Sequence, residues 1–217
     1  DNHKNVMNNI VCLIGLIDLY STSAKLSIEN VYCRPKIIES DSSFVDAKDI
    51  RHPIVEKIQK DIPYVPNDVK LNEDGILLYG TNACGKSTLM KSIGLSIIMA
   101  QSGFFVPCSA FEYSPYTQIF TRILNNDNIF KGQSSFAVEM SELRSILVRS
   151  DNKSLVLGDE LCSGTENISA LCLVAAGLKT LSDIKCSFIF TSHLHQLMDI
   201  SLVQSIQNLN VYHLKII

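Results

Sequence analysis

The feature that most constrains this chain is the segment at residues 80–88, which reads Gly-Thr-Asn-Ala-Cys-Gly-Lys-Ser-Thr. It matches the pattern G-x-x-x-x-G-K-[ST], in which the glycines let the backbone bend so that successive N–H groups point at anionic phosphates. Lys86 would meet the β- and γ-phosphates, and the Ser87 hydroxyl would ligate Mg²⁺. We therefore predict a nucleotide-binding loop with contacts from Gly80, Thr81, Asn82, Ala83, Cys84, Gly85, Lys86, Ser87 and Thr88.

The segments around this loop fit a strand that enters it and a helix that leaves it. Residues 76–79 form a short apolar run, and apolar residues recur at helical spacing over residues 86–102. Further strands are predicted at residues 44–51, 119–124, 154–158 and 186–191, and further helices at 4–20, 134–150 and around 168–178. Short buried strands that alternate with helices favour an α/β fold with a mainly parallel sheet covered by helices.

Two acids, Asp159 and Glu160, follow the strand at 154–158, and His193 follows the strand at 186–191. Ligands of parallel sheets sit beyond the carboxyl ends of the strands, so these residues are expected beside the phosphate loop. Asp159 would hold Mg²⁺ together with Ser87, Glu160 would polarise the attacking water, and His193 would hydrogen-bond the γ-phosphate. The alternatives are an acidic N-cap for the next helix and a structural histidine. The predicted catalytic residues are Lys86, Glu160 and His193, and the predicted metal ligands are Ser87 and Asp159.

The composition limits the partners and the compartment. A net charge of −3 over 217 residues gives no bulk attraction to nucleic acid or to an anionic membrane. The seven cysteines include no C-x-x-C pair, which favours an intracellular, reducing compartment. The longest apolar run, residues 10–17, stops at Asp18, so we expect no membrane span. The chain starts without methionine and ends in an apolar run, so we expect a fragment that is truncated at its C-terminal end.

Several short motifs follow one another along the chain. They are Arg-His-Pro-Ile-Val-Glu at 51–56, the loop at 80–88, Ser-Ser-Phe-Ala-Val-Glu-Met at 134–140, Leu-Val-Leu-Gly-Asp-Glu at 155–160, Gly-Thr at 164–165 and Ser-His at 192–193. In this order they closely resemble the ATPase domain of the MutS DNA mismatch-repair family. The resemblance covers residues 44–217, and residues 1–43 are similar to the end of that family's lever-arm helix with a connector. For the helix at 4–20, a terminal helix packed on the core is the alternative.

The resemblance implies a P-loop NTPase fold of the ABC type that uses ATP and Mg²⁺. Two such domains would dimerise, as a homodimer, and complete each other's sites. Ser134 matches the serine that reaches the γ-phosphate of the partner, and the adjacent Ser135 is also a candidate. Asn82 matches the family's loop asparagine, and Tyr64 lies where the family places an aromatic ring against adenine, although a buried loop tyrosine is the alternative. Double-stranded DNA would be contacted through domains outside this fragment.

The implied function is ATP hydrolysis that drives dimer-linked clamping on DNA during mismatch repair. The residues after Glu160 lack the arginine usual in the family, which leaves open an ATP-dependent switch in recombination control with little hydrolysis. A transporter domain is not favoured, because no L-S-G-G-Q-like segment is present. Cys84 replaces a usual glycine. Close to Lys86 and a helix start, its thiol is expected to react with small thiol reagents, unless it points into the sheet.

Overall fold

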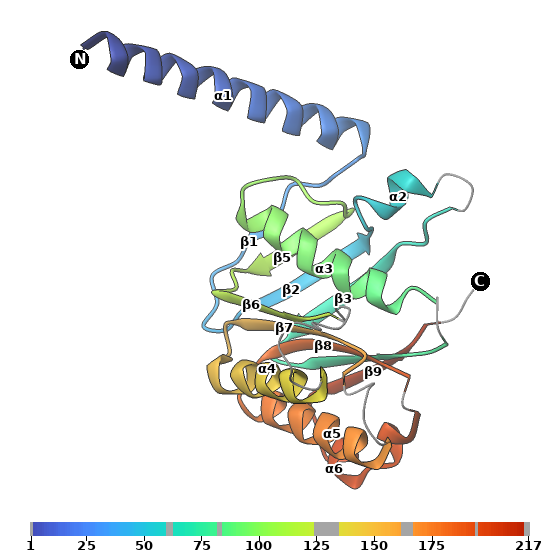
Figure 1. The fold of residues 1–217 in the computed structure, drawn as a ribbon. Helices are drawn as coiled ribbons and strands as arrows, with labels where there is room; N and C mark the ends of the chain where they lie inside the picture. Colours follow the sequence, from blue (N-terminus) through green and yellow to red (C-terminus); the bar gives the residue numbers. More distant parts are fainter. Residues whose placement is uncertain are drawn as a thin grey trace.

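The computed structural model describes residues 2–59, 63–81, 84–123, 135–161, 167–193 and 195–214, which are arranged around two β-sheets (Figure 1). The larger sheet has the strand order β6-β7-β8-β4-β9, and every neighbouring pair in it is parallel. Its strands are β4 (Gly75–Tyr79), β6 (Gln118–Arg122), β7 (Ser154–Asp159), β8 (Ser187–Ser192) and β9 (Leu209–His213). This confirms the predicted α/β class with a mainly parallel sheet.

Helices cover both faces of the larger sheet (Figure 1). Side chains alternate along β4, so that Ile76 and Leu78 lie in one apolar core and Leu77 lies in the other. The first core also contains α3 (Lys86–Gln101), and the second contains α4 (Ser135–Arg149), α5 (Asn167–Asp183), the 3₁₀ helix η2 (His195–Asp199) and α6 (Ser201–Gln204). Strands buried on both faces are continuous apolar runs, which is why the sequence revealed them.

The second sheet was not predicted. It is a mixed sheet with the strand order β1-β5-β2-β3, formed by β1 (Lys36–Ile37), β5 (Ala110–Ser114), β2 (Phe44–Ile50) and β3 (Asn67–Asn72). Its inner side chains, such as Val45 and Leu71, share one core with Met90 and Ile97 of α3, so α3 lies between the two sheets. β3 lies in a stretch for which no strand was predicted, and only Val69 and Leu71 of its six residues are buried. Such a short, half-polar strand has too little apolar pattern to be recognised in advance.

The first helix is longer than predicted. α1 runs over Asn2–Glu29 and therefore includes the first part of the predicted connector. Its serines fit a helix because their hydroxyls bond preceding carbonyls: Ser21 Oγ donates to Asp18 O at 3.1 Å, and Ser27 Oγ donates to Ser23 O at 2.7 Å. α1 extends away from both sheets in Figure 1, and apolar side chains such as Ile14 and Ile17 are each 60% exposed. The alternative of a terminal helix packed on the core is therefore wrong.

The same helix is one weak candidate for a membrane span, which was not expected from the sequence. Residues His3–Glu29 are long and apolar enough to cross a bilayer, judged by length and composition alone. Asp18 ends the apolar run, but one charge in a continuous helix still leaves a mostly apolar segment. A single helix of this kind is weak support for a membrane, because core helices of soluble proteins and signal sequences near an N-terminus meet the same criteria.

Candidate nucleotide-binding site

The predicted phosphate loop joins the carboxyl end of β4 to the start of α3. Two glycines there have backbone angles that other residues rarely adopt: φ is 152° at Gly80 and 95° at Gly85. A Cβ on Gly80 would also lie 3.0 Å from the carbonyl oxygen of Leu214 and 3.1 Å from Cys84 Sγ. Gly85 directly precedes α3, so the loop delivers Lys86 at the first turn of that helix. Both glycines are therefore required by the backbone path.

Lys86 is buried and turns back onto the loop. Its ammonium donates to Gly80 O at 2.8 Å and to Thr81 O at 2.9 Å, and the residue is 5% exposed. Carbonyl oxygens satisfy the donors of an ammonium group but carry no full negative charge. No ion pair in the described part of the chain involves Lys86. An anion that entered the loop would supply the missing counter-charge.

The Ser87 hydroxyl and the Asp159 carboxylate meet across the start of α3 and the end of β7. Ser87 Oγ donates to Asp159 Oδ1 at 2.7 Å, and Asp159 is 7% exposed. The same oxygen accepts a hydrogen bond from Thr191 Oγ1 at 2.6 Å, because Asp159 and Thr191 are partners in the register of β7 and β8. Asp159 thus bonds hydroxyl groups of the loop and of β8. The next described helix, α5, begins at Asn167, eight positions after Asp159, so Asp159 is not the N-cap of that helix.

Glu160 and His193 lie next to each other at the same edge. His193 Nδ1 is 3.7 Å from Glu160 Oε1, and the two side chains are 45% and 25% exposed. Glu160 has a positive φ of 47°, which is uncommon for a residue with a side chain. Its N–H donates to Thr191 Oγ1 at 3.1 Å and to Thr191 O at 3.2 Å. The structure thus brings Glu160 and His193, two of the three predicted catalytic residues, together at the strand ends, and both side chains are partly exposed to solvent.

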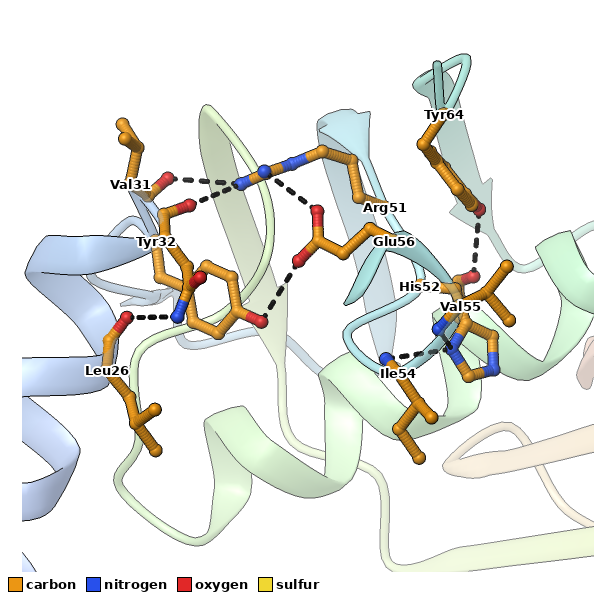
Figure 2. Close-up of polar contacts among 11 residues, drawn as sticks. Leu26, Val31, Tyr32, Arg51, His52, Ile54, Val55, Glu56 and Tyr64 are labelled. Carbon is orange, nitrogen blue, oxygen red and sulfur yellow. Dashed lines mark hydrogen bonds and ion pairs between the residues drawn. The ribbon is translucent and has the colours of Figure 1, made fainter. Parts of the chain in front are cut away.

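Tyr64 lies over the second turn of α3, beyond the loop itself. Its hydroxyl, at the upper right of Figure 2, is 3.4 Å from Ser92 Oγ. Ser92 Oγ in turn donates to Thr88 O at 2.7 Å. Thr88 lies in the first turn of α3, so Ser92 links Tyr64 to the start of that helix. The side chain of Tyr64 is half-buried. This position beside the helix that starts at the loop is compatible with either predicted role, a ring against adenine or a packed loop tyrosine.

Some predicted contacts are not covered by the structure. Asn82, Ala83 and Ser134 lie outside the described residues. Ser135 is described only as the first residue of α4. The assignments of these four residues stay predictions. Thr191 is the residue that sequence reasoning missed. The signal that could have found it is its position at the carboxyl end of the predicted strand at 186–191, beside the strand that ends in Asp159.

The motif at residues 51–56 forms a second polar cluster, far from the loop in sequence. Arg51 Nη1 donates to Glu56 Oε2 at 2.9 Å, and Arg51 Nη2 donates to the carbonyls of Asn30 at 3.0 Å and Val31 at 3.2 Å (Figure 2). Tyr32 completes the cluster, since its hydroxyl donates to Glu56 Oε1 at 3.1 Å. Burial, reinforced by the Glu56 charge, raises the pKa of Tyr32 to about 12. These bonds join the end of α1 to α2 (Val55–Ile58).

His52 belongs to the same turn and acts as an acceptor. Its Nδ1 accepts hydrogen bonds from the backbone N–H groups of Ile54 at 3.2 Å and Val55 at 3.3 Å (Figure 2). Burial, together with the positive charge of Lys91, lowers the pKa of His52. A neutral ring with a free Nδ1 lone pair suits this role. Arg51 and His52, whose roles the sequence left open, therefore hold the backbone between α1 and α2.

Together these features define an α/β protein with a buried lysine and a buried aspartate at the loop-bearing edge of a parallel sheet. Comparison with known proteins identifies the family to which this protein belongs. The family model for MutS domain V matches residues 76–217. A mutS homolog of Acanthamoeba polyphaga mimivirus is 41% identical over 99% of this chain and 22% of its own length. The chain belongs to the MutS family.

Two other relatives support the same assignment. The mitochondrial DNA mismatch repair protein mutS homolog of Sarcophyton glaucum is 35% identical over 96% of this chain and 21% of its own length. The DNA mismatch repair protein MutS of Lactobacillus helveticus is 40% identical over 85% of this chain and 22% of its own length. The chain therefore spans about a fifth of the length of the curated relatives it matches.

Proposed function

We propose that this chain is the ATP-binding and ATP-hydrolysing domain of a MutS-like mismatch-repair protein, with a P-loop fold of the ABC type. The observation that carries the proposal is a pair of buried, oppositely charged groups without counter-ions among the described residues. Lys86 meets only carbonyl oxygens, and Asp159 meets hydroxyl groups and no cation. Buried charges without partners are costly, so a ligand that carries both signs would stabilise the site. A nucleotide triphosphate with its metal ion has this property.

The donor atoms at the site fit Mg²⁺. Ser87 Oγ and Asp159 Oδ1 are both oxygen atoms, 2.7 Å apart, at the start of α3. Within the described residues there is no cluster of three or more His, Cys, Asp or Glu side chains that would hold a metal by itself. Mg²⁺ in nucleotide sites takes one or two protein ligands and completes its shell with phosphate oxygens and water. When bound, it neutralises charge that develops on the phosphates.

Each side chain of the site would have a separate role in hydrolysis. Lys86 would leave its carbonyl partners for the β- and γ-phosphates, and the loop N–H groups would hold the phosphate oxygens. Glu160 would accept a proton from the attacking water, and its partial exposure leaves room for that water. His193, 3.7 Å from Glu160 Oε1, would hydrogen-bond the γ-phosphate on the same side. Tyr64 would lie beside the adenine ring. Further contacts to the phosphates would come from Asn82 and from Ser134 or Ser135.

The broader setting is also a proposal. Residues 44–217 would form the ATPase domain, and α1 would be the end of a lever that reaches domains outside this chain. A second MutS-like subunit would complete the site, and ATP would favour the dimer. Double-stranded DNA would bind through the outer domains, since a net charge of −3 gives this chain little attraction for phosphates. We also propose a reducing, intracellular compartment, in line with six described cysteines that are all free.

The test is a titration with a fluorescent ATP analogue, with and without Mg²⁺, beside steady-state phosphate release. Wild type should bind the analogue and hydrolyse ATP slowly. Glu160→Gln should bind equally well and turn over about a hundredfold more slowly, because an amide cannot accept the proton. Glu112→Gln, an exposed acid on β5, serves as the matched control. Wild-type turnover in Glu160→Gln would contradict the catalytic assignment.

Two further outcomes decide between the related readings. Nucleotide binding without turnover in wild type would support the alternative, a switch in recombination control with little hydrolysis. Light scattering of Glu160→Gln with and without ATP tests the composite site. A dimer that forms only with ATP is expected, and a monomer at high concentration in both conditions would count against a site completed by a partner.

A further inference from the structure

The hydroxyl of Thr191 connects the two acids of the candidate site. It donates to Asp159 Oδ1 at 2.6 Å and accepts from the N–H of Glu160 at 3.1 Å. A hydroxyl is the smallest side-chain group that can donate and accept at the same time. Thr191 is 1% exposed, so water has no access with which to replace either bond. A single buried atom therefore determines where two successive acidic residues lie.

The first consequence concerns the Asp159 carboxylate. Its Oδ1 receives the hydroxyl of Ser87 at 2.7 Å from the loop side and the hydroxyl of Thr191 at 2.6 Å from β8. Two hydroxyl donors on one oxygen fix the plane of the carboxylate, and hydrogen bonds to an ionised group are the strong ones. If Thr191 did not donate, Ser87 would be the one described residue that holds the carboxylate, and a metal ion would also engage Ser87.

The second consequence concerns the backbone at Glu160. Its φ of 47° lies in the left-handed region, where a side chain is disfavoured and the surrounding structure must hold the conformation. The N–H of Glu160 is held by both oxygens of Thr191, the hydroxyl at 3.1 Å and the carbonyl at 3.2 Å. This turn brings the Glu160 side chain off the strand toward His193, within 3.7 Å.

We propose that Thr191 is a positioning residue of this site, which orients the Asp159 carboxylate toward the metal ion and holds the Glu160 turn in place for the attacking water. This inference rests on the proposed ATPase function. Thr191 touches neither nucleotide nor metal ion in this role, and it acts through the two acids. A β-branched residue suits the place, because Thr191 is inside β8 and its χ1 angle is restricted there.

The experiment compares three variants of the chain. Thr191→Val keeps the shape of the side chain and removes the two hydrogen bonds of the hydroxyl, to Asp159 Oδ1 and from the Glu160 N–H. Thr191→Ser keeps the hydroxyl. Ile189→Val is the matched control, because Ile189 lies two residues earlier on the same strand, is fully buried and loses one methylene. Three quantities are measured: the Mg²⁺ concentration at half-maximal binding of a fluorescent ATP analogue, the rate of phosphate release, and the urea midpoint of unfolding.

For Thr191→Val we expect the Mg²⁺ midpoint to rise and turnover to fall, each by roughly tenfold, while analogue binding in excess EDTA stays unchanged. Thr191→Ser should restore both quantities to within about threefold of wild type. Ile189→Val should lower the urea midpoint and leave both the Mg²⁺ midpoint and turnover unchanged. The split between metal-dependent and metal-free binding is a result that a loss of packing alone would not produce.

Three results would overturn the inference. A Thr191→Val variant with the wild-type Mg²⁺ midpoint and turnover would show that neither hydrogen bond matters to the site. Equal losses in Thr191→Ser and Thr191→Val would assign Thr191 to packing. Wild type that binds no nucleotide would overturn the proposed ATPase function, and the role of Thr191 with it, whereas the first two results leave that function intact.

Discussion

Two polar clusters of this molecule contain charged groups that are at least partly buried, but the groups find opposite kinds of partner. In the Arg51 junction, formed by Tyr32, Arg51, His52 and Glu56, the cation and the anion bond each other at 2.9 Å, with 24% and 10% of their side chains exposed. At the phosphate edge, formed by Lys86, Ser87, Asp159, Glu160 and Thr191, the two most buried charges bond neutral groups instead.

This difference in bonding partners distinguishes charged groups that stabilise the fold from charged groups that can bind a charged ligand. A part-buried ion pair whose members neutralise each other leaves no net charge to attract a charged ligand. A buried charge that is met only by carbonyls or hydroxyls is partly stabilised, and a ligand of opposite sign can improve on those partners. Substitution of Lys86, the buried cation of the phosphate edge, should therefore alter nucleotide binding, and substitutions in the Arg51 junction should alter stability.

The largest effect is expected from Lys86→Ala. Loss of the only described cation in the phosphate loop should weaken binding of a fluorescent ATP analogue by at least about a hundredfold. The urea midpoint should stay unchanged or rise, because the substitution removes a buried charge that has no counter-ion. Lys91→Ala, in the second turn of α3, is the control and should bind normally. A large loss of stability in Lys86→Ala would break the comparison, since Lys86 would then be holding the fold.

Arg51→Ala should have the opposite profile. The substitution removes the guanidinium donor from the Glu56 carboxylate, which keeps only the Tyr32 hydroxyl among the described partners, and from two backbone carbonyls. This should cost about 2 kcal/mol in the free energy of unfolding. Nucleotide binding should change by less than about twofold. Lys48→Ala removes a surface pair with Asp68 and should leave stability nearly unchanged. Urea unfolding and analogue titration of the same samples provide both numbers, and a parallel loss of binding would show that the two clusters are coupled.

The pH dependence of stability gives a smaller effect. The pKa of His52 is lowered in the folded chain, so below its unfolded value of about 6.5 the unfolded state binds more protons. The contribution of His52 to stability is therefore present in full above that value, and it is lost as the pH falls through the lowered folded pKa. His52→Asn keeps an acceptor for the turn but does not titrate. The difference in unfolding free energy between pH 7.5 and pH 5 should shrink in this variant, and an unchanged difference would refute the assignment.

The smallest effect concerns Cys84, which lies in the phosphate loop but makes no side-chain hydrogen bond within the described structure. Cys84→Gly should change turnover by no more than about twofold. In the parent chain, a small thiol reagent should modify Cys84 and inactivate the ATPase, and MgATP should slow that modification. Mass mapping is needed because Cys12 and Cys172 are exposed and will also react. Inactivation that persists undiminished in Cys84→Gly would rule out this cysteine as the sensitive site.

What the sequence alone determined about this protein is local. The phosphate loop, the acids after the strand at 154–158 and the helices at 86–102 and 134–150 were predicted, because each depends on a pattern within one short segment. The central strands β4, β7 and β8 were found for the same reason: each is a short, mostly apolar run. The family assignment also follows from such motifs, and the comparisons confirm it.

The tertiary structure alone decided which distant groups meet. Thr191 bonds Asp159 across 32 positions of sequence, and Ser87 bonds Asp159 across 72. Arg51 reaches Asn30 across 21 positions, and the alternating strand β3 became recognisable only once β2 lay beside it. The register between strands and the packing of side chains set these contacts, and neither leaves a pattern within a single segment. For this reason, the sequence predicted the chemistry of the site, whereas only the fold showed which neighbours hold that chemistry in place.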